Sequence, residues 1–194
     1  MYPGSTRLGH ARYTRTAVAL HWTLVVAILC ALAMGWLMTN MAITPLKLRL
    51  YSWHKWIGVT ALALLGVRAL WRLRHPPPPM VPMAAWQHVG AQMLHAFLYG
   101  MMLMQPLTGW IFSNASGYPI VYLARIRLPD LVGPDKALAN AFRNYHHIGA
   151  VIFAAAIAVH ALAALKHHWK DQDDTLRRML HWRASPVADM RTEQ

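Results

Sequence analysis

Four long apolar stretches constrain the fold of this chain more strongly than any other feature of its sequence. They cover residues 17–38, 53–73, 89–112 and 146–166. Each is close to the ~20 residues that a helix needs to cross the hydrocarbon core of a bilayer. We therefore expect an all-α fold, an integral membrane four-helix bundle that forms a single domain over residues 1–194.

Composition excludes several other classes of protein. Charged residues make up 13% of the chain, about half the share in a typical soluble domain. The net charge of +12 does not indicate nucleic-acid binding, because Lys and Arg fall in short clusters between the apolar stretches. The single cysteine, Cys30, excludes a disulfide framework, a zinc cluster and covalent haem attachment through Cys-x-x-Cys-His.

The second apolar stretch differs from the others because it contains two arginines. To reach a full crossing, this helix must include Arg68 and Arg72. Arg72 is near enough to the end of the stretch to extend its charge to the interface. Arg68 lies deeper, so we expect it to have an anionic partner.

The distribution of Lys and Arg predicts the orientation in the membrane. Four crossings place both termini on one side. Seven of the 19 basic residues fall on the opposite, outer side. The others fall in the N-terminal tail, in the linker after the second crossing with Arg68 and Arg72 counted there, and in the C-terminal tail. The seven are Lys47, Arg49, Lys55, Arg125, Arg127, Lys136 and Arg143. The positive-inside rule therefore predicts cytoplasmic termini. We also expect an outer loop over residues 113–144 and a short interfacial helix over residues 173–182.

Two histidines of the fourth stretch are spaced in a way that suits the binding of two stacked cofactors. His146 and His160 are fourteen residues apart, which on a helix is about four turns and a rise of about 21 Å. Both imidazoles therefore lie on one face of the helix, one near each side of the membrane. Ionisable residues in such positions are costly in lipid and usually functional.

Histidines on the other stretches lie at matching depths. His54 is level with His146 on the outer side, and His21 is closer to the level of His160 on the inner side. We predict that these pairs bind the irons of two haem b groups, His54 with His146 and His21 with His160. Ligation by two imidazoles fills both axial positions, which suits electron transfer better than oxygen binding.

The fourteen-residue interval recurs at three further positions. Gly35 follows His21 by fourteen residues, and Gly109 follows His95 by fourteen. Glycine would let a planar macrocycle approach the backbone. Arg68 follows the histidine of the second stretch by the same interval, which places it at the depth of the inner haem. We hypothesise that Arg68 pairs with a propionate of that haem.

Other histidines leave alternatives open. His95 could replace His21 as ligand of the inner haem, bond a propionate or serve a quinone. His147 points about 100° away from its neighbour His146, and His167 is favoured as a solvated interfacial residue. An intramembrane histidine can also simply bond a carbonyl group of a neighbouring helix. A haem-free protein that binds a metal is disfavoured, because the apolar stretches contain no acidic residue.

Several short motifs resemble the prokaryotic cytochrome b561 family in their order and spacing over nearly all of residues 10–182. They are Ala19-Leu20-His21-Trp22, Trp53-His54-Lys55-Trp56-Ile57-Gly58, Val67-Arg68-Ala69-Leu70-Trp71-Arg72 before a proline run, His95 with Pro106-Leu107-Thr108-Gly109-Trp110, and Tyr145-His146 with His160-Ala161-Leu162-Ala163-Ala164. The resemblance implies a four-helix dihaem protein of the bacterial inner membrane that exchanges electrons with quinone. It also implies His21, His54, His146 and His160 as axial ligands.

Two functions are consistent with this resemblance. At least one family member is a superoxide oxidase, which passes the electron of superoxide to ubiquinone, and the basic outer loops of this chain would attract a small anion such as superoxide. The same loops could equally contact lipid headgroups. The alternative function is a non-catalytic membrane anchor and electron conduit for a partner dehydrogenase or hydrogenase, docked at residues 113–144. Whether the chain forms a homodimer or joins a redox subunit is open.

Overall fold

The computed structural model describes residues 13–79, 81, 83–173 and 175–180, and this part of the chain is mainly helical. The elements are α1 (Arg15–Thr39), α2 (Pro45–Arg74), α3 (Ala85–Ala115), β1 (Val121–Tyr122), β2 (Ile126–Arg127), α4 (Lys136–Trp169) and α5 (Arg177–Leu180). The helical architecture expected from the sequence is confirmed.

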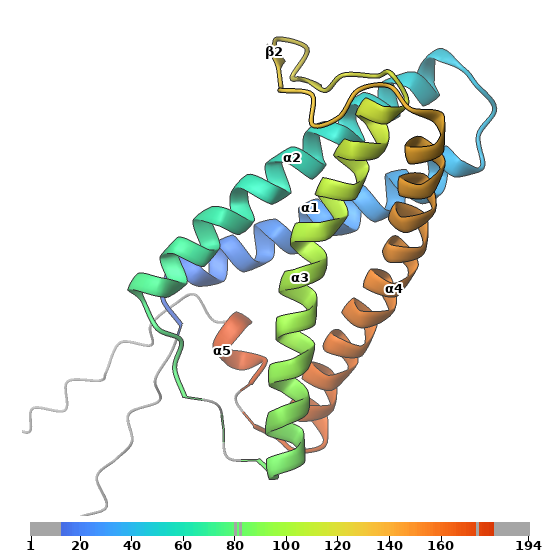
Figure 1. Ribbon diagram of the computed structural model, residues 1–194. Coiled ribbons are helices and arrows are strands. Elements are labelled where there is room, and N and C mark those ends of the chain that lie inside the picture. The colour runs from blue at the N-terminus through green and yellow to red at the C-terminus, as the bar shows by residue number, and fades with distance from the viewer. Residues whose placement is uncertain (1–12, 80, 82, 174, 181–194) are drawn as a thin grey trace, which may run out of the picture.

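The four long helices form an elongated bundle (Figure 1). α1 packs along α2, α3 packs along α4, and α2 also contacts α3. The antiparallel ribbon of β1 and β2 lies at one end of the bundle, and α5 lies at the other end, where α1 also begins (Figure 1). The two ends of the bundle are therefore different in structure, one closed by a hairpin loop and one by the C-terminal segment.

Local capping residues fix where three of the long helices begin. The Thr14 and Thr44 hydroxyls accept the backbone N–H groups of residues three positions on, and Pro45 occupies the first turn of α2. The Asp135 carboxylate accepts the N–H of Leu138 at 2.9 Å. Such caps satisfy N–H groups that have no partner within the helix.

α2 and α4 begin earlier than hydropathy predicts. α2 was expected from residue 53 and begins at Pro45, and α4 was expected from residue 146 and begins at Lys136. Their 30 and 34 residues correspond to about 45 and 51 Å, longer than the ~30 Å core of a bilayer. The segment between α3 and α4 covers residues 116–135, shorter than the expected loop over 113–144. The reason is that polar turns extend the helices beyond the apolar stretches.

In the described part of the chain, three helices are long and apolar enough to cross a membrane: α1, α2 and α4. α3 is comparable in length, with 31 residues, but Gln92, His95 and Gln105 lower its hydropathy. Gln105 is buried, with 9% of its surface exposed. The polar residues of α3 therefore face the bundle in part rather than lipid.

The short helix expected over residues 173–182 is observed only as α5, Arg177–Leu180, and residues 174, 181 and 182 of the expected range lie outside the described residues. α5 contacts the bundle through two hydrogen bonds. The Trp22 indole donates to the Met179 carbonyl oxygen at 2.8 Å, and Arg178 donates to that of Pro79 at 2.9 Å. These bonds join the C-terminal segment to α1 and to the proline linker.

Apolar packing in the centre of the bundle is thin. None of the described side chains is exposed by less than 2%. Phe153, on α4, is 4% exposed and lies seven residues from both His146 and His160. It separates an outer level of the bundle, near the hairpin, from an inner level, near α5.

Candidate functional site

Two histidines face each other at the outer level of the bundle. The ring centroids of His54 on α2 and His146 on α4 are 6.0 Å apart, and their planes are inclined by 87°. Nδ1 of His54 is 3.0 Å from the Ala31 carbonyl oxygen, and Nδ1 of His146 is 3.1 Å from that of Gln105. A carbonyl oxygen can only accept, so each Nδ1 carries the proton and each Nε2 is left with a lone pair that can bind a metal.

The last turns of α3 hold His146 through several contacts that sequence analysis did not identify. The Thr108 hydroxyl lies 3.2 Å from Nδ1 of His146 and donates to the Gln105 carbonyl oxygen at 2.9 Å. The Gln105 amide donates to the His146 carbonyl oxygen at 3.3 Å. The imidazole and the backbone of His146 are thus both fixed by α3. The one sequence feature that pointed to these contacts was the motif from Pro106 to Trp110, which contains Thr108. Its role could not be read from the sequence, because its partner His146 lies on α4, far along the chain.

Gly35 and Gly109 provide space for imidazole rings. A Cβ atom at Gly109 would lie 3.0 Å from Cε1 of His146, tighter than ordinary contact. At Gly35 a Cβ atom would lie 3.5 Å from Cε1 of His54, which is an ordinary van der Waals distance. The sequence suggested that these glycines admit a macrocycle, whereas the nearest neighbours in the structure are the histidines of the outer level.

Three histidines converge at the inner level. The rings of His21 on α1 and His160 on α4 have centroids 6.4 Å apart, inclined by 72°. His95 on α3 lies on the other side, 5.3 Å from His160. Trp22 packs edge-on against His21 at 5.4 Å. His147, which follows His146 in the sequence, is exposed and is part of neither group of histidines.

Arg68 extends across the inner end of the bundle to two other helices. Its Nη1 donates to the Ala17 carbonyl oxygen of α1 at 3.0 Å, and its Nε donates to the Tyr99 hydroxyl of α3 at 3.0 Å. Among the ion pairs of the described residues, none involves Arg68. The anionic partner expected from the sequence is therefore not a side chain in this part of the protein.

The spacing of the two cross-bundle pairs fits an iron bound between them. Bonds of about 2 Å from a metal to two imidazole nitrogens, plus the radii of the rings, separate the ring centroids by roughly 6 Å. The observed separations of 6.0 and 6.4 Å match this value. α1 and α4 are not among the closely packed helix pairs of the bundle, so His21 and His160 meet across a gap between helices.

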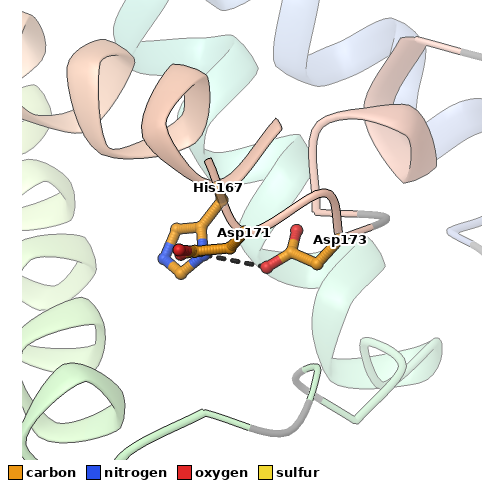
Figure 2. A group of neighbouring side chains, drawn as sticks. All are labelled: His167, Asp171 and Asp173. Carbon is orange, nitrogen blue, oxygen red and sulfur yellow. Dashed lines mark hydrogen bonds and ion pairs between the residues drawn. The ribbon is translucent and has the colours of Figure 1, made fainter. Parts of the chain in front are cut away.

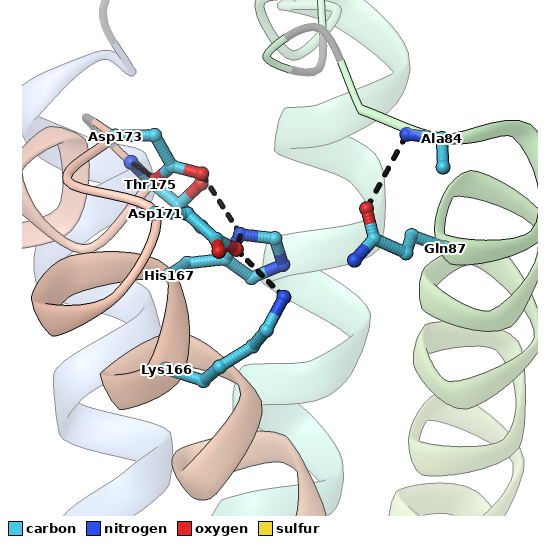
Figure 3. A network of polar contacts seen from close by, with 7 residues as sticks. All are labelled: Ala84, Gln87, Lys166, His167, Asp171, Asp173 and Thr175. Carbon is cyan, nitrogen blue, oxygen red and sulfur yellow. Dashed lines mark hydrogen bonds and ion pairs between the residues drawn. The ribbon is translucent and has the colours of Figure 1, made fainter.

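A separate polar cluster lies where α4 ends. Nδ1 of His167 is 3.0 Å from the Asp171 carboxylate and 2.8 Å from that of Asp173, and Lys166 lies 2.7 Å from Asp171 (Figures 2 and 3). The histidine and the two aspartates are close enough to hold a metal ion. The lysine already supplies a cation to Asp171, so we interpret the cluster as an ion-pair network that joins α4 to the following loop.

The network lowers the pKa of Asp173. Burial raises the pKa of this carboxyl group, but hydrogen bonds from Thr175 and the charge and hydrogen bond of His167 outweigh burial, so the pKa lies below its ordinary value. The Thr175 N–H donates to the Asp173 carboxylate at 2.8 Å (Figure 3).

At the neighbouring start of α3, the Ala84 N–H donates to the Gln87 side chain at 3.3 Å (Figure 3).

Comparison with known proteins covers nearly the whole chain. Residues 12–182 match the family model described as prokaryotic cytochrome b561. Two relatives come from Escherichia coli: cytochrome b561 homolog 2, 30% identical over 87% of this chain and 91% of its own length, and cytochrome b561 homolog 1, 32% identical over 87% and 97%. A protein of Yersinia pestis named probable superoxide oxidase CybB is 29% identical over 88% and 97%.

The difference between the two glycines predicts different effects of adding a methyl group. Gly109→Ala would force the ring of His146 against its bonds to Gln105 and Thr108, and overpacking of this kind costs about 1–3 kcal/mol. We expect weaker retention of haem at the outer level, measured as haem per protein after purification. Gly35→Ala, with ordinary contact to His54, is the matched control and should retain haem. Equal retention by both variants would contradict this role of Gly109.

The lowered pKa of Asp173 predicts a loss of local stability in acid. The ionised carboxylate stabilises the folded loop at pH values above the ordinary carboxyl pKa, and this contribution is lost as pH falls through the lowered value. Amide hydrogen exchange at Thr175 should therefore lose protection in that range, because its acceptor becomes protonated. Asp173→Asn keeps a neutral acceptor, so its exchange should show no such transition. A transition that persists in this variant would show that another group is responsible.

Proposed function

Because the chain belongs to the prokaryotic cytochrome b561 family, whose members are membrane electron carriers that bind haem b, we propose that it is a dihaem cytochrome. In this proposal it transfers electrons between a donor on the outer side and the quinone pool of the bacterial inner membrane. The observation that carries the proposal is the presence of two facing imidazole pairs, each near 6 Å, at two levels of one bundle.

Each pair would hold one haem b through Nε2 atoms. His54 and His146 are prepared for this role by carbonyl groups that orient both rings. His21 and His160 would hold the second haem at the inner level. When bound, each haem supplies an iron that alternates between the ferric and ferrous states and so carries one electron. The histidines of each pair would hold the haem from two helices, and the residues around them would fix the orientations of the rings.

The position of His95 favours a role beside the inner haem rather than as its ligand. Its ring centroid is 5.3 Å from that of His160, less than the roughly 6 Å of two rings bridged by a metal. The corresponding distance for His21 is 6.4 Å. The outer ligand is assigned to His146 rather than His147, because His147 is exposed.

The proposed arrangement in the membrane has four crossings with both termini in the cytoplasm. α3 would be the fourth crossing, since it packs along α4 and also contacts α2, and its polar residues lie in part inside the bundle. The hairpin loop would then face the outer side. The excess of Lys and Arg at the end where α1 begins supports this orientation.

Superoxide is the donor that the outer surface favours. Of the seven basic residues expected there, one, Arg127, forms an ion pair within the described residues, with Asp130 at 2.9 Å. A surface with unpaired positive charge accelerates the arrival of a small anion. In the overall reaction, two superoxide ions would each lose one electron to give oxygen, and one quinone would gain the two electrons and two protons to give quinol. The name of the Yersinia pestis relative is consistent with this donor.

Substitution of the histidines tests the haem assignment. His54→Ala and His146→Ala should each lose the same haem, and His21→Ala and His160→Ala should each lose the other, because each haem would be held by both histidines of its pair. Pyridine haemochrome quantification counts the haems, and a redox titration followed by difference spectra separates their potentials. His147→Ala is the control and should retain both. Colourless wild-type protein, expressed with ample haem, would refute the assignment.

Stopped-flow kinetics tests the donor and the acceptor. Purified protein should consume superoxide and reduce an added ubiquinone analogue, and the rate should fall as ionic strength rises, because salt screens the outer charges. Protein with two haems that does not react with superoxide would exclude this donor. Co-purification of a dehydrogenase or hydrogenase subunit from native membranes would then favour the electron conduit.

A further inference from the structure

Two guanidinium groups converge on one phenol at the inner end of the bundle. Arg68 and Arg72 are one turn apart on α2, and both donate to the Tyr99 hydroxyl of α3, Arg68 through Nε at 3.0 Å and Arg72 through Nη1 at 3.1 Å. Arg72 also lies over the Tyr99 ring, 5.6 Å from its centroid. Arg68 and Tyr99 are half-buried. We call Arg68, Arg72 and Tyr99 the inner clamp.

The charges of the inner clamp are not balanced by the described part of the protein. The ion pairs among the described residues involve Arg127, Lys166 and His167 as cations. Neither arginine of the clamp takes part in one. Both guanidinium groups lie against one oxygen atom, so their like charges repel each other, although Arg72 is exposed and its charge is partly screened. A bound anion would turn this repulsion into attraction, and guanidinium groups bind carboxylates well because of their planar geometry.

The hydroxyl group of Tyr99 adds a donor to the two charges. It accepts one N–H from each arginine, so both lone pairs of the phenol oxygen are used and its own proton remains to be donated. An oxyanion placed at the clamp would accept this O–H together with unused N–H groups of the arginines. The clamp therefore offers both the charge and the directed donors that a carboxylate needs.

The clamp lies beside the inner histidines. Tyr99 is one helical turn from His95, whose ring contacts His160, and Arg68 bonds the Ala17 carbonyl oxygen one turn before His21. We propose that the inner clamp binds a propionate carboxylate of the inner haem, with Tyr99 and Arg72 as positioning residues beside the Arg68 predicted from the sequence. This inference rests on the proposed function and adds the direction in which the haem lies: its carboxylate edge faces the end of α2.

Esterified haem provides a direct test. Haem b and its dimethyl ester differ only in the charge and bonding of the propionates. Both would be titrated into haem-depleted His54→Ala protein, which the proposed function leaves with the inner site alone. We expect haem b to bind at least roughly tenfold more tightly than the ester, the ratio that corresponds to one hydrogen bond between charged groups. Equal dissociation constants would overturn the clamp.

Variants assign the effect to individual side chains. Tyr99→Phe keeps the ring but removes the donor, so the preference for haem b over the ester should fall severalfold. Arg68→Gln should abolish most of the preference, and the inner haem potential should fall, because a positive charge near the iron favours the ferrous state. Arg74→Gln removes a charge from the same end of α2 and is the matched control, expected to keep the full preference. Circular dichroism verifies that each variant is folded.

The outcomes separate the clamp from the proposed function. Protein that binds neither haem refutes the proposed function itself. Two haems in the wild type with equal affinity for acid and ester refute the clamp alone. Phosphate of an anionic lipid is the competing ligand. If affinity for haem b does not change in Tyr99→Phe while binding of anionic lipid in nanodiscs does, the clamp serves lipid and the proposal is wrong.

Discussion

Two pairs of imidazole rings face each other across the bundle at two levels. They connect α4 with α2 at the outer level and α4 with α1 at the inner level, and neither helix pair is among the closely packed ones. The centre contains little else, since the described residues include no side chain exposed by less than 2%. Phe153 lies between the levels. A planar group at each of the two levels, as the proposed function requires, would add contacts to this thinly packed centre.

The two levels differ in how their histidines are supported. At the outer level, carbonyl groups orient both rings, and α3 encloses His146 with Gln105, Thr108 and Gly109. A hydrogen bond to Nδ1 makes the opposite nitrogen more electron-donating, so this support affects the properties of a bound iron as well as its position. At the inner level, the histidines have a third imidazole and two arginines as neighbours. Such different surroundings would give two haems of the same type different potentials and therefore a direction for electron transfer.

Charge is distributed along the bundle according to the cost of desolvation. Arg68 is half-buried, and it donates to a carbonyl group of α1 and to a phenol of α3, with the proposed carboxylate as a third partner. Six of the seven outer basic residues lie on the extensions of α2 and α4 or on the hairpin loop, and the seventh, Lys55, is half-buried at the start of the second apolar stretch. The cluster of Lys166, His167 and two aspartates lies at the opposite end of the bundle, where α4 ends.

The sequence by itself determined the helical membrane architecture, the two levels at which the paired histidines lie, and the family. Apolar length, the fourteen-residue interval and motif order are local or periodic properties, and a helix converts them directly into height along its axis. It missed the early starts of α2 and α4, because capped polar turns leave no trace in hydropathy. Only the tertiary structure decided which side chains meet: Gln105 and Thr108 beside His146, and Tyr99 between two arginines. These contacts join residues about 30 to 40 positions apart, and their rotational register about neighbouring helices is fixed by packing, which a single sequence does not express.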